Sequence, residues 1–191
     1  MSKGIKILII VAVVILVILF PLIGSYNKMV RLDQSVKQSE SDIDTQLQRR
    51  SDLIPNLIAT VKGYATQEKS IFTELADARS KLAGAQNLTQ KAEADNQLSG
   101  SLSRLLMIVE NYPDLKSNQN FRDLSITLEG TENRIGIARK DYNIKVGEYN
   151  GVTRSFPNSI IAGIFRFDPK PYYKAAEGSK EVPKVDFSMG K

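Results

Sequence analysis

One helical stripe, between Asn118 and Phe156, constrains the fold of this chain more than any other feature. Apolar side chains recur there in steps of three and four residues, at Phe121, Leu124, Leu128, Ile135, Ala138, Tyr142, Tyr149 and Val152. Thr131 and Lys145 fill the two open positions of the pattern. This spacing places the side chains on one face of an α-helix. Such a helix is stable in water only when that face packs on other helices, so the stripe predicts a helical bundle.

Three further helices are predicted before this one. The first is indicated by Met29, Leu32, Val36, Ile43 and Leu47, and we expect it to end near residues 49–52. Pro55 is expected to begin the second, which runs to about Leu82, and Asn87 or Thr89 to cap the third. Asn118 or Asn120 is then the cap of the last helix. The region 26–156 is therefore predicted to be an antiparallel bundle of about four long helices, in an all-α fold.

An uncharged segment precedes the bundle. Residues 1–6 are short and basic, and the run from Ile7 to Gly24 carries no charge. At about 1.5 Å per residue such a helical run covers roughly 27 Å, close to the hydrocarbon core of about 30 Å. We therefore predict an N-terminal transmembrane helix over residues 7–25. Its anchoring residues are Ile7, Leu8, Val11, Val14, Leu16, Phe20 and Ile23.

A cleaved signal peptide is the alternative for this segment, because it too begins with basic residues. The apolar run is long for that purpose, and Pro-Leu-Ile-Gly-Ser-Tyr at its end is a poor cleavage site. An uncleaved, single-pass anchor is therefore preferred. Basic residues flank it at Lys3 and Lys6 on one side and at Lys28, Arg31 and Lys37 on the other. By the positive-inside rule, this bias of one residue favours the bundle on the cytoplasmic side.

The helical period breaks at Phe156-Pro157, and residues 157–191 are expected to form an apolar segment followed by an extended C-terminal arm. Pro169, Pro171 and Pro183 argue against helix in the arm. The apolar segment has three interpretations: it covers the end of the core, touches the membrane interface, or docks on a neighbouring subunit. Its candidate oligomer or membrane contacts are Ile160, Ile161, Ile164, Phe165 and Phe167.

The residue content excludes several kinds of chemistry. The 191 residues include no Cys and no His, which removes disulfides, thiolate nucleophiles, Cys/His zinc sites and imidazole bases. The net charge of +5 is spread along the chain, without the basic block of a nucleic-acid binder. Nucleotide-binding and EF-hand motifs are absent from the sequence. We therefore predict no enzyme activity, no cofactor, no metal and no nucleic-acid partner.

Two charged features are candidates for sites. Arg49 and Arg50 could contact a lipid head group, although compensation of a helix C-terminus is the favoured interpretation. The carboxylate pairs Asp42/Asp44 and Glu129/Glu132 indicate solvated, charged helix faces more than a metal or catalytic site.

Several strings occur together and in order along the chain. They are QLQRRSDLIPN at 46–56, VKGY at 61–64, NYPDLKSN at 111–118, LEGTENRI at 128–135, RKDYN at 139–143, FPNSIIAG at 156–163 and KPYY at 170–173. Together they resemble the LemA family over nearly the whole chain, from about Tyr26 to Phe187. Ser51 departs from the family pattern, which typically has His at this position.

The resemblance implies a bacterial inner-membrane protein with one N-terminal span, a soluble bundle of long helices and no known enzymatic activity. It also hints at membrane organisation, because a family member is associated with magnetosome membranes. Our first hypothesis is a membrane-bound scaffold whose partners are the lipid bilayer and further copies of the chain. The alternative is a monovalent adaptor that binds another membrane protein or an envelope protease through the arm from Asp168 to Lys191.

Overall fold

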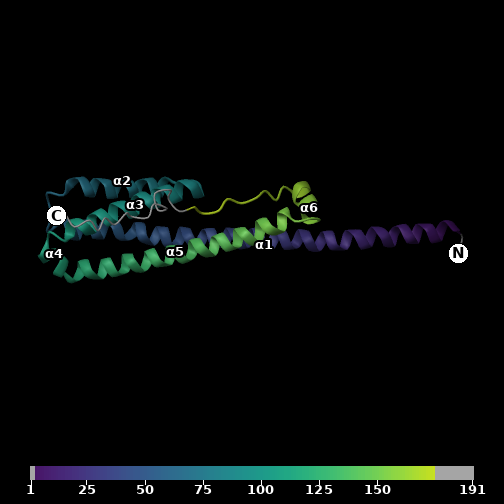
Figure 1. Ribbon diagram of the computed structural model, residues 1–191, viewed down its shortest axis with the longest axis horizontal. Helices are drawn as coiled ribbons and strands as arrows, with labels where there is room; N and C mark the ends of the chain where they lie inside the picture. Colours follow the sequence, from purple (N-terminus) through teal and green to yellow (C-terminus); the bar gives the residue numbers. More distant parts are fainter. Residues whose placement is uncertain (1–2, 175–191) are drawn as a thin grey trace, which may run out of the picture. The chain divides into compact units, whose positions relative to one another are not determined.

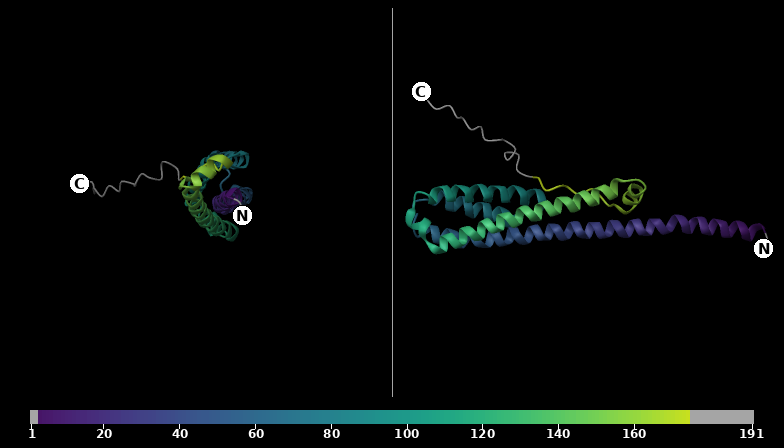
Figure 2. Two further views of the ribbon diagram at one scale, coloured as in Figure 1. Left: turned by 90° about the vertical axis from the view of Figure 1, so that its right-hand side faces the viewer. Right: turned by 60° about the horizontal axis from the view of Figure 1, so that its bottom comes forward.

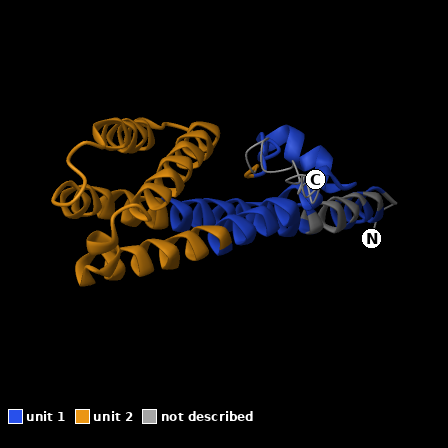
Figure 3. Cartoon of the chain, turned by 60° about the vertical axis from the view of Figure 1, so that its left-hand side comes forward, with its two compact units in different colours: residues 1–44, 137–172 blue, residues 45–136, 173–191 orange. Residues whose placement is uncertain are grey.

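The computed structural model describes residues 3–174, without the side chains of residues 3, 7, 11, 14–19 and 21. Its helices are α1 (Lys3–Lys62), α2 (Lys69–Gly84), α3 (Leu88–Val109), α4 (Pro113–Ser117), α5 (Gln119–Arg154) and α6 (Asn158–Phe165) (Figure 1). No strand occurs in this described range, so the predicted all-α class is confirmed. The chain divides into two compact units (Figure 3): unit 1 is residues 1–44 and 137–172, and unit 2 is residues 45–136 and 173–191. Both α1 and α5 therefore contribute to both units.

Helix α1 is continuous where two helices were expected. The predicted end near residues 49–52 and the restart at Pro55 are both wrong. Proline has no N–H, so Pro55 leaves the carbonyl oxygen of Ser51 without its helical donor. Arg79 of α2 supplies the missing bond, since its Nε donates to Ser51 O at 3.1 Å. Because a side chain of α2 satisfies this buried acceptor, the helix continues past the proline to Lys62.

Within unit 2, α2 and α3 pack against each other as a helical hairpin. Asn87 caps α3, as predicted, because its side-chain oxygen accepts a hydrogen bond from Gln90 N at 2.9 Å. The Gln90 side chain in turn accepts from Gln86 N at 2.8 Å. This reciprocal arrangement satisfies backbone donors that would otherwise be unpaired at the start of a helix. Asn118 caps α5 in the same way, with Phe121 N donating to Oδ1 at 3.1 Å.

The core of unit 2 is made by the second part of α1, by α2, α3 and α4, and by the first part of α5. Its fully or nearly fully buried side chains include Leu47, Ile54, Leu57, Val61, Ile71, Leu75, Leu98, Leu105, Leu115, Phe121 and Ile135. Phe121 and Ile135 belong to the stripe predicted from the sequence. The stripe is therefore confirmed in this unit as the packing face of α5.

The core of unit 1 joins the first part of α1 to the second part of α5 and to α6. Its buried residues include Met29, Val36, Ile43, Tyr142, Val146, Tyr149, Ile161 and Ala162. The predicted stripe is confirmed at Tyr142 and Tyr149. It differs at one position, because Val146 is buried where Lys145 was expected to fill the pattern.

The structure does not support the predicted membrane anchor. In the described part of the chain, no helix is both long enough and apolar enough to cross a membrane. Of the residues named for the anchor, Ile7, Val11, Val14 and Leu16 have side chains outside the described residues. Leu8, Phe20 and Ile23 are exposed.

The C-terminal arm is non-helical over residues 168–174, as predicted, and its residues 168–171 are held against α5 within unit 1. Asn150 makes two bonds to the Lys170 backbone: its Nδ2 donates to Lys170 O at 2.9 Å, and its Oδ1 accepts from Lys170 N at 2.8 Å. Tyr142 and Tyr149 donate from their hydroxyls to Pro171 O and Asp168 O, at 2.9 and 3.0 Å. The first part of the arm is thus bound to its own chain, and the predicted arm from residue 175 to 191 lies outside the described residues.

Candidate functional site

The first candidate site is the exposed face of α6, which turns back at the end of α5 (Figure 2). Ile160, Ile164 and Phe165 are 57%, 69% and 56% exposed. Ile161 is buried and Phe167 is half-buried in a cluster with Met29. The apolar segment therefore covers the core of unit 1 with Ile161 and part of Phe167, which is one of its three predicted roles. The other three side chains project to the surface, and their contact with a membrane or a neighbouring subunit stays a prediction.

Two sets of contacts fix the orientation of α6: a hydrogen bond at its C-terminal end and ring contacts with α1. Phe167 N donates to Ala162 O at 2.9 Å across Arg166, which adopts a left-handed conformation with φ of 57°. This is the Schellman arrangement, in which the residue after the left-handed position packs on the end of the helix. Tyr26 of α1 contacts the ring of Phe165, with ring centroids 4.8 Å apart, and that of Phe167, at 5.6 Å. These contacts keep the exposed face of α6 at the surface, because rotation of the helix to bury that face would break them.

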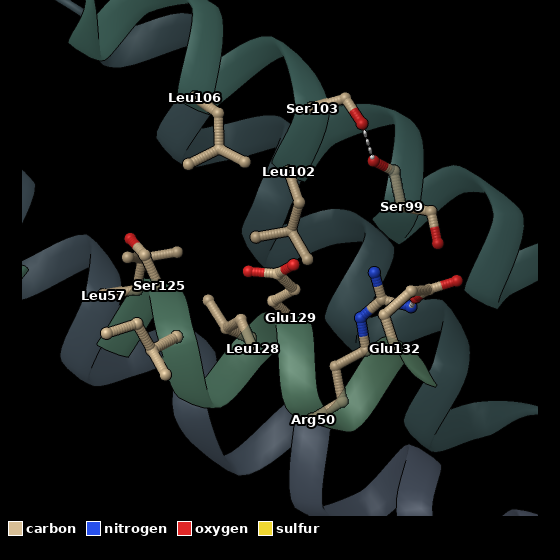
Figure 4. A pocket seen from close by; sticks show the side chains of 11 residues that line it. Arg50, Leu57, Ser99, Leu102, Ser103, Leu106, Ser125, Leu128, Glu129 and Glu132 are labelled. Carbon is tan, nitrogen blue, oxygen red and sulfur yellow. Dashed lines mark hydrogen bonds and ion pairs between the residues drawn. The ribbon is translucent and has the colours of Figure 1, made fainter. Parts of the chain in front are cut away.

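The second candidate site is a cavity of about 470 Å³ in unit 2. Its walls come from α1, α3 and α5, and its apolar lining is formed by Leu57, Leu102, Leu106, Ile126 and Leu128. Glu129 and Glu132 of α5 also line it, and Figure 4 shows Glu132 and Arg50 pointing toward one another. Ser103 of the lining donates its hydroxyl to Ser99 O in its own helix, at 2.9 Å. With no imidazole in the chain to activate it, this serine is not arranged as a nucleophile.

Arg50 is the electrostatic centre of this second site. Its Nη1 lies 3.0 Å from Asp95 Oδ1 and 2.6 Å from Glu132 Oε2. The Asp95 side chain is 0% exposed, whereas that of Glu132 is 47% exposed. Burial lowers the pKa of the Arg50 guanidinium, although the charge of Glu132 and its hydrogen bond oppose that shift. The group therefore serves to neutralise a buried carboxylate.

This position corrects the prediction for Arg50. A residue that is 4% exposed and ion-paired inside unit 2 cannot also contact a lipid head group. The interpretation as helix-end compensation is wrong as well, because α1 continues past it to Lys62. Arg49 is exposed, and its head-group contact stays a prediction. The carboxylate of Glu132 is neutralised from α1, by Arg50.

Among the residues that the structure describes, no group of three or more acidic side chains is placed to hold a metal ion. Asp33 is instead bound by two lysines, Lys37 Nζ at 2.8 Å and Lys170 Nζ at 2.9 Å. Burial alone would raise the pKa of Asp33, but the hydrogen bonds and charges of these two lysines outweigh it and lower that pKa.

Several of the strings that mark the family resemblance meet through hydrogen bonds. In unit 2, Asn118 Nδ2 donates to the Tyr64 hydroxyl at 2.9 Å, which joins NYPDLKSN to VKGY. In the same place, the Tyr112 hydroxyl donates to Glu68 Oε1 at 3.0 Å. In unit 1, the Tyr142 hydroxyl donates to Pro171 O, which joins RKDYN to KPYY. These strings therefore have structural roles.

A further surface feature was missed by our sequence reasoning. The face of α5 opposite the predicted stripe carries Ile126, Ile137 and Ile144, which are 67%, 61% and 47% exposed. The signal was present in the sequence, because the three isoleucines keep helical spacing two residues away from the inner stripe, or about 200° around the helix. A search limited to one packing face per helix overlooks it.

Comparison with known proteins gives consistent relatives. The family model described as LemA family matches residues 39–187. A magnetosome protein MamQ of Magnetospirillum gryphiswaldense is 26% identical over 178 residues, or 80% of this chain and 65% of that protein. The magnetosome protein MamQ 2 of Paramagnetospirillum magneticum is 25% identical over 179 residues, or 80% of this chain and 66% of that protein. A protein LemA of Metamycoplasma hominis is 23% identical over 144 residues, or 75% and 66% of the two chains.

The match thus spans about two thirds of the length of these relatives, at 65–66%. The names of these relatives describe those proteins alone, and none of them states a substrate or a reaction. The family model covers most of the present chain, including parts of both units and every helix from the middle of α1 to α6. This chain therefore belongs to the LemA family.

Proposed function

We propose that this chain is a non-enzymatic scaffold protein of the bacterial inner membrane that self-associates along helix α5. The observation that carries the proposal is the outer stripe of α5, at Ile126, Gly130, Asn133, Ile137, Lys140 and Ile144, whose isoleucines are exposed, although Ile126 also lines the cavity of unit 2. These positions alternate in steps of four and three residues, the spacing that brings two helices together as a coiled coil. The same helix therefore has one stripe for its own core and a second for another copy.

The composition of the outer stripe suits a specific contact. A Cβ added at Gly130 would meet no atom within 4 Å, so a neighbouring helix has room to approach there. Asn133 and Lys140 place polar groups between the isoleucines, and polar residues at seam positions select register at a cost in stability. The stripe ends at Gly147, where a Cβ would lie 3.6 Å from the Tyr172 hydroxyl of the arm.

The energy of this contact indicates a role for the membrane. Full burial of an isoleucine contributes about 1.5–3 kcal/mol, so three half-exposed isoleucines on each of two copies contribute on the order of 5–10 kcal/mol. Association costs about 4–15 kcal/mol in lost freedom. The two ranges overlap, so the seam by itself is marginal. Confinement of copies to one bilayer raises their effective concentration and shifts the equilibrium toward association.

The alternative role as an adaptor is less favoured. That role needs the arm to be available for another membrane protein, but the residues 168–171 are held by Tyr142, Tyr149 and Asn150. We retain the scaffold as the function, with the bilayer and further copies as its partners.

Size measurement of the full-length chain in mild detergent tests the proposal. We expect oligomers at micromolar concentration, and we expect the double variant Ile137→Glu/Ile144→Glu to be monomeric with unchanged helix content. Met107→Glu is the matched control, because Met107 is an apolar side chain on α3 that is 64% exposed. A monomeric wild type, or a double variant that assembles like the wild type, would refute self-association through α5.

A further inference from the structure

Two segments of unit 1 contain no acidic residue. The sequence has no Asp or Glu in residues 1–32 or in residues 149–167. Those two segments carry Lys3, Lys6, Lys28, Arg31, Arg154 and Arg166. They are far apart in the chain, yet unit 1 brings them together, because Met29 of α1 packs on Ile161 and Ala162 of α6. This contact brings the part of α1 that carries Lys28 and Arg31 next to α6, which Arg154 and Arg166 flank.

The same region exposes large apolar side chains. Ile160, Ile164 and Phe165 project from α6, and Phe156 just before α6 is 83% exposed. On α1, Phe20 and Ile23 are also exposed, a short distance along the helix from Tyr26, which contacts Phe165. Exposed apolar groups among cations are the pattern of helices that lie in a membrane interface.

We propose that α6 is an interfacial helix that binds the surface of an anionic phospholipid bilayer. Ile160, Ile164 and Phe165 enter the boundary between head groups and acyl chains, while Arg154 and Arg166 pair with lipid phosphates. This inference rests on the proposed membrane association and deepens it, because it assigns the lipid contact to named side chains of unit 1.

Charge favours lipid over a second copy of the chain as the occupant of this face. In a symmetric dimer each copy presents the same surface to the other. Here that would bring Arg154 and Arg166 of one copy close to the same two residues of its partner, with no carboxylate in either acid-free segment to compensate. An anionic bilayer supplies the missing negative charge and accepts the apolar side chains as well.

The backbone at Arg166 adds a second argument. Its φ of 57° lies in the left-handed region, where glycine is the usual residue after a helix. An arginine at this place accepts a conformational penalty and keeps a positive charge at the end of the apolar face. Lipid phosphate provides a physical reason for a charged residue at that position.

The absence of tryptophan from the chain permits a direct test. The variant Ile164→Trp is made in the full-length chain and mixed with vesicles that contain phosphatidylglycerol and brominated lipid. We expect its fluorescence to shift to the blue and to be quenched by roughly half or more. The matched control Met107→Trp replaces a residue of similar exposure on α3 of unit 2, 64% against 69%, and should be quenched little.

The outcomes separate this inference from the proposed function. If the Ile164→Trp variant floats with the vesicles but its indole is not quenched, α6 does not bind lipid, although membrane association stands. A blue shift without quenching means contact with protein and overturns the inference in favour of a second copy. Failure to float overturns both membrane association and this inference, while self-association is still judged by the size measurement.

The charge requirement is tested by Arg154→Gln/Arg166→Gln in the Ile164→Trp background. Each cation near an anionic surface contributes about a fivefold gain in binding, so we expect α6 insertion to weaken about 25-fold at low ionic strength. Lys81→Gln/Lys116→Gln, which removes the same charge from unit 2, is the control. An equal loss in the control indicates general attraction alone and overturns the assigned role of the two arginines.

Discussion

The two units differ in how their cationic side chains are paired with carboxylates. In unit 2, the cation Arg50 is buried and meets Asp95 and Glu132 within the same unit. In unit 1, a whole region around α6 carries cations without a carboxylate in the same segments, next to exposed apolar side chains. The first arrangement is complete within the chain and contributes to folding. The second is incomplete without a partner, and that difference is why we place the proposed membrane contact in unit 1.

The largest effect on stability is expected at Arg50. Removal of one member of a buried ion pair leaves the other charge uncompensated, at a cost of about 3–5 kcal/mol. Arg50→Ala should therefore lower the free energy of unfolding by this amount, measured by chemical denaturation. The double variant Arg50→Met/Asp95→Leu should recover most of the loss. If Arg50→Ala unfolds like the wild type, the polar centre of unit 2 is not structural and the contrast between the units fails.

A smaller effect is expected from the bond between Arg79 and Ser51. Arg79→Met removes the donor and leaves a buried carbonyl unsatisfied, at a cost of about 1–3 kcal/mol. In the background Pro55→Ala the helix supplies its own N–H, so the same substitution should cost less than about 0.5 kcal/mol. Thermal unfolding of the four proteins in this cycle measures the coupling. Equal costs in both backgrounds would show that Arg79 does not replace the donor that proline lacks.

This arrangement also shows where inference from the sequence succeeds. The stripe of α5 was predictable, because helical periodicity is a local property of the residues between Phe121 and Val152. The continuation of α1 through Pro55 was not, because its compensating donor, Arg79, lies on another helix. The caps at Asn87 and Asn118 were predictable for the same reason as the stripe, since each acts on a backbone N–H three residues away.

The candidate sites also combine local signals, which the sequence shows, with contacts between distant residues, which only the fold shows. The lack of acidic residues in 1–32 and 149–167 is visible in the sequence, but only the fold places the two segments together. In the apolar segment, the sequence could not decide which residues face inward, because α6 has only 8 residues and is apolar throughout most of its length. Arg50 was assigned to the surface because its partner Asp95 is 45 residues away in the chain.

The attachment of the arm in unit 1 provides the third prediction. Asn150→Ala removes two hydrogen bonds to the Lys170 backbone, and the loss of about 1–2 kcal/mol should be local. Hydrogen exchange of residues 168–172 should accelerate about 5- to 30-fold, while exchange in α3 is unchanged. Gln119→Ala, an exposed amide elsewhere on α5, is the control. If exchange in the arm does not change, the arm is held by other contacts than this side chain.

The smallest effect is expected from pH, through Asp33 of unit 1. Its pKa in the folded protein lies below the ordinary value of 3.8, because the hydrogen bonds and charges of Lys170 and Lys37 outweigh burial. A lowered pKa in the folded state means that the stabilisation is complete above pH 3.8 and is lost as the pH falls through the folded value.

The contact between Lys170 and Asp33 should therefore loosen only in acid. Protection of the Lys170 amide, followed by NMR from about pH 5 to about pH 2.5, should fall more in the wild type than in Asp33→Asn, in which the titrating group is absent. The buried pair of unit 2 gives no such change at its guanidinium, because an arginine keeps its proton throughout this range. An equal loss of protection in both proteins would mean that the carboxylate of Asp33 does not hold the arm, and that the ion pairs of unit 1 are surface contacts of little consequence.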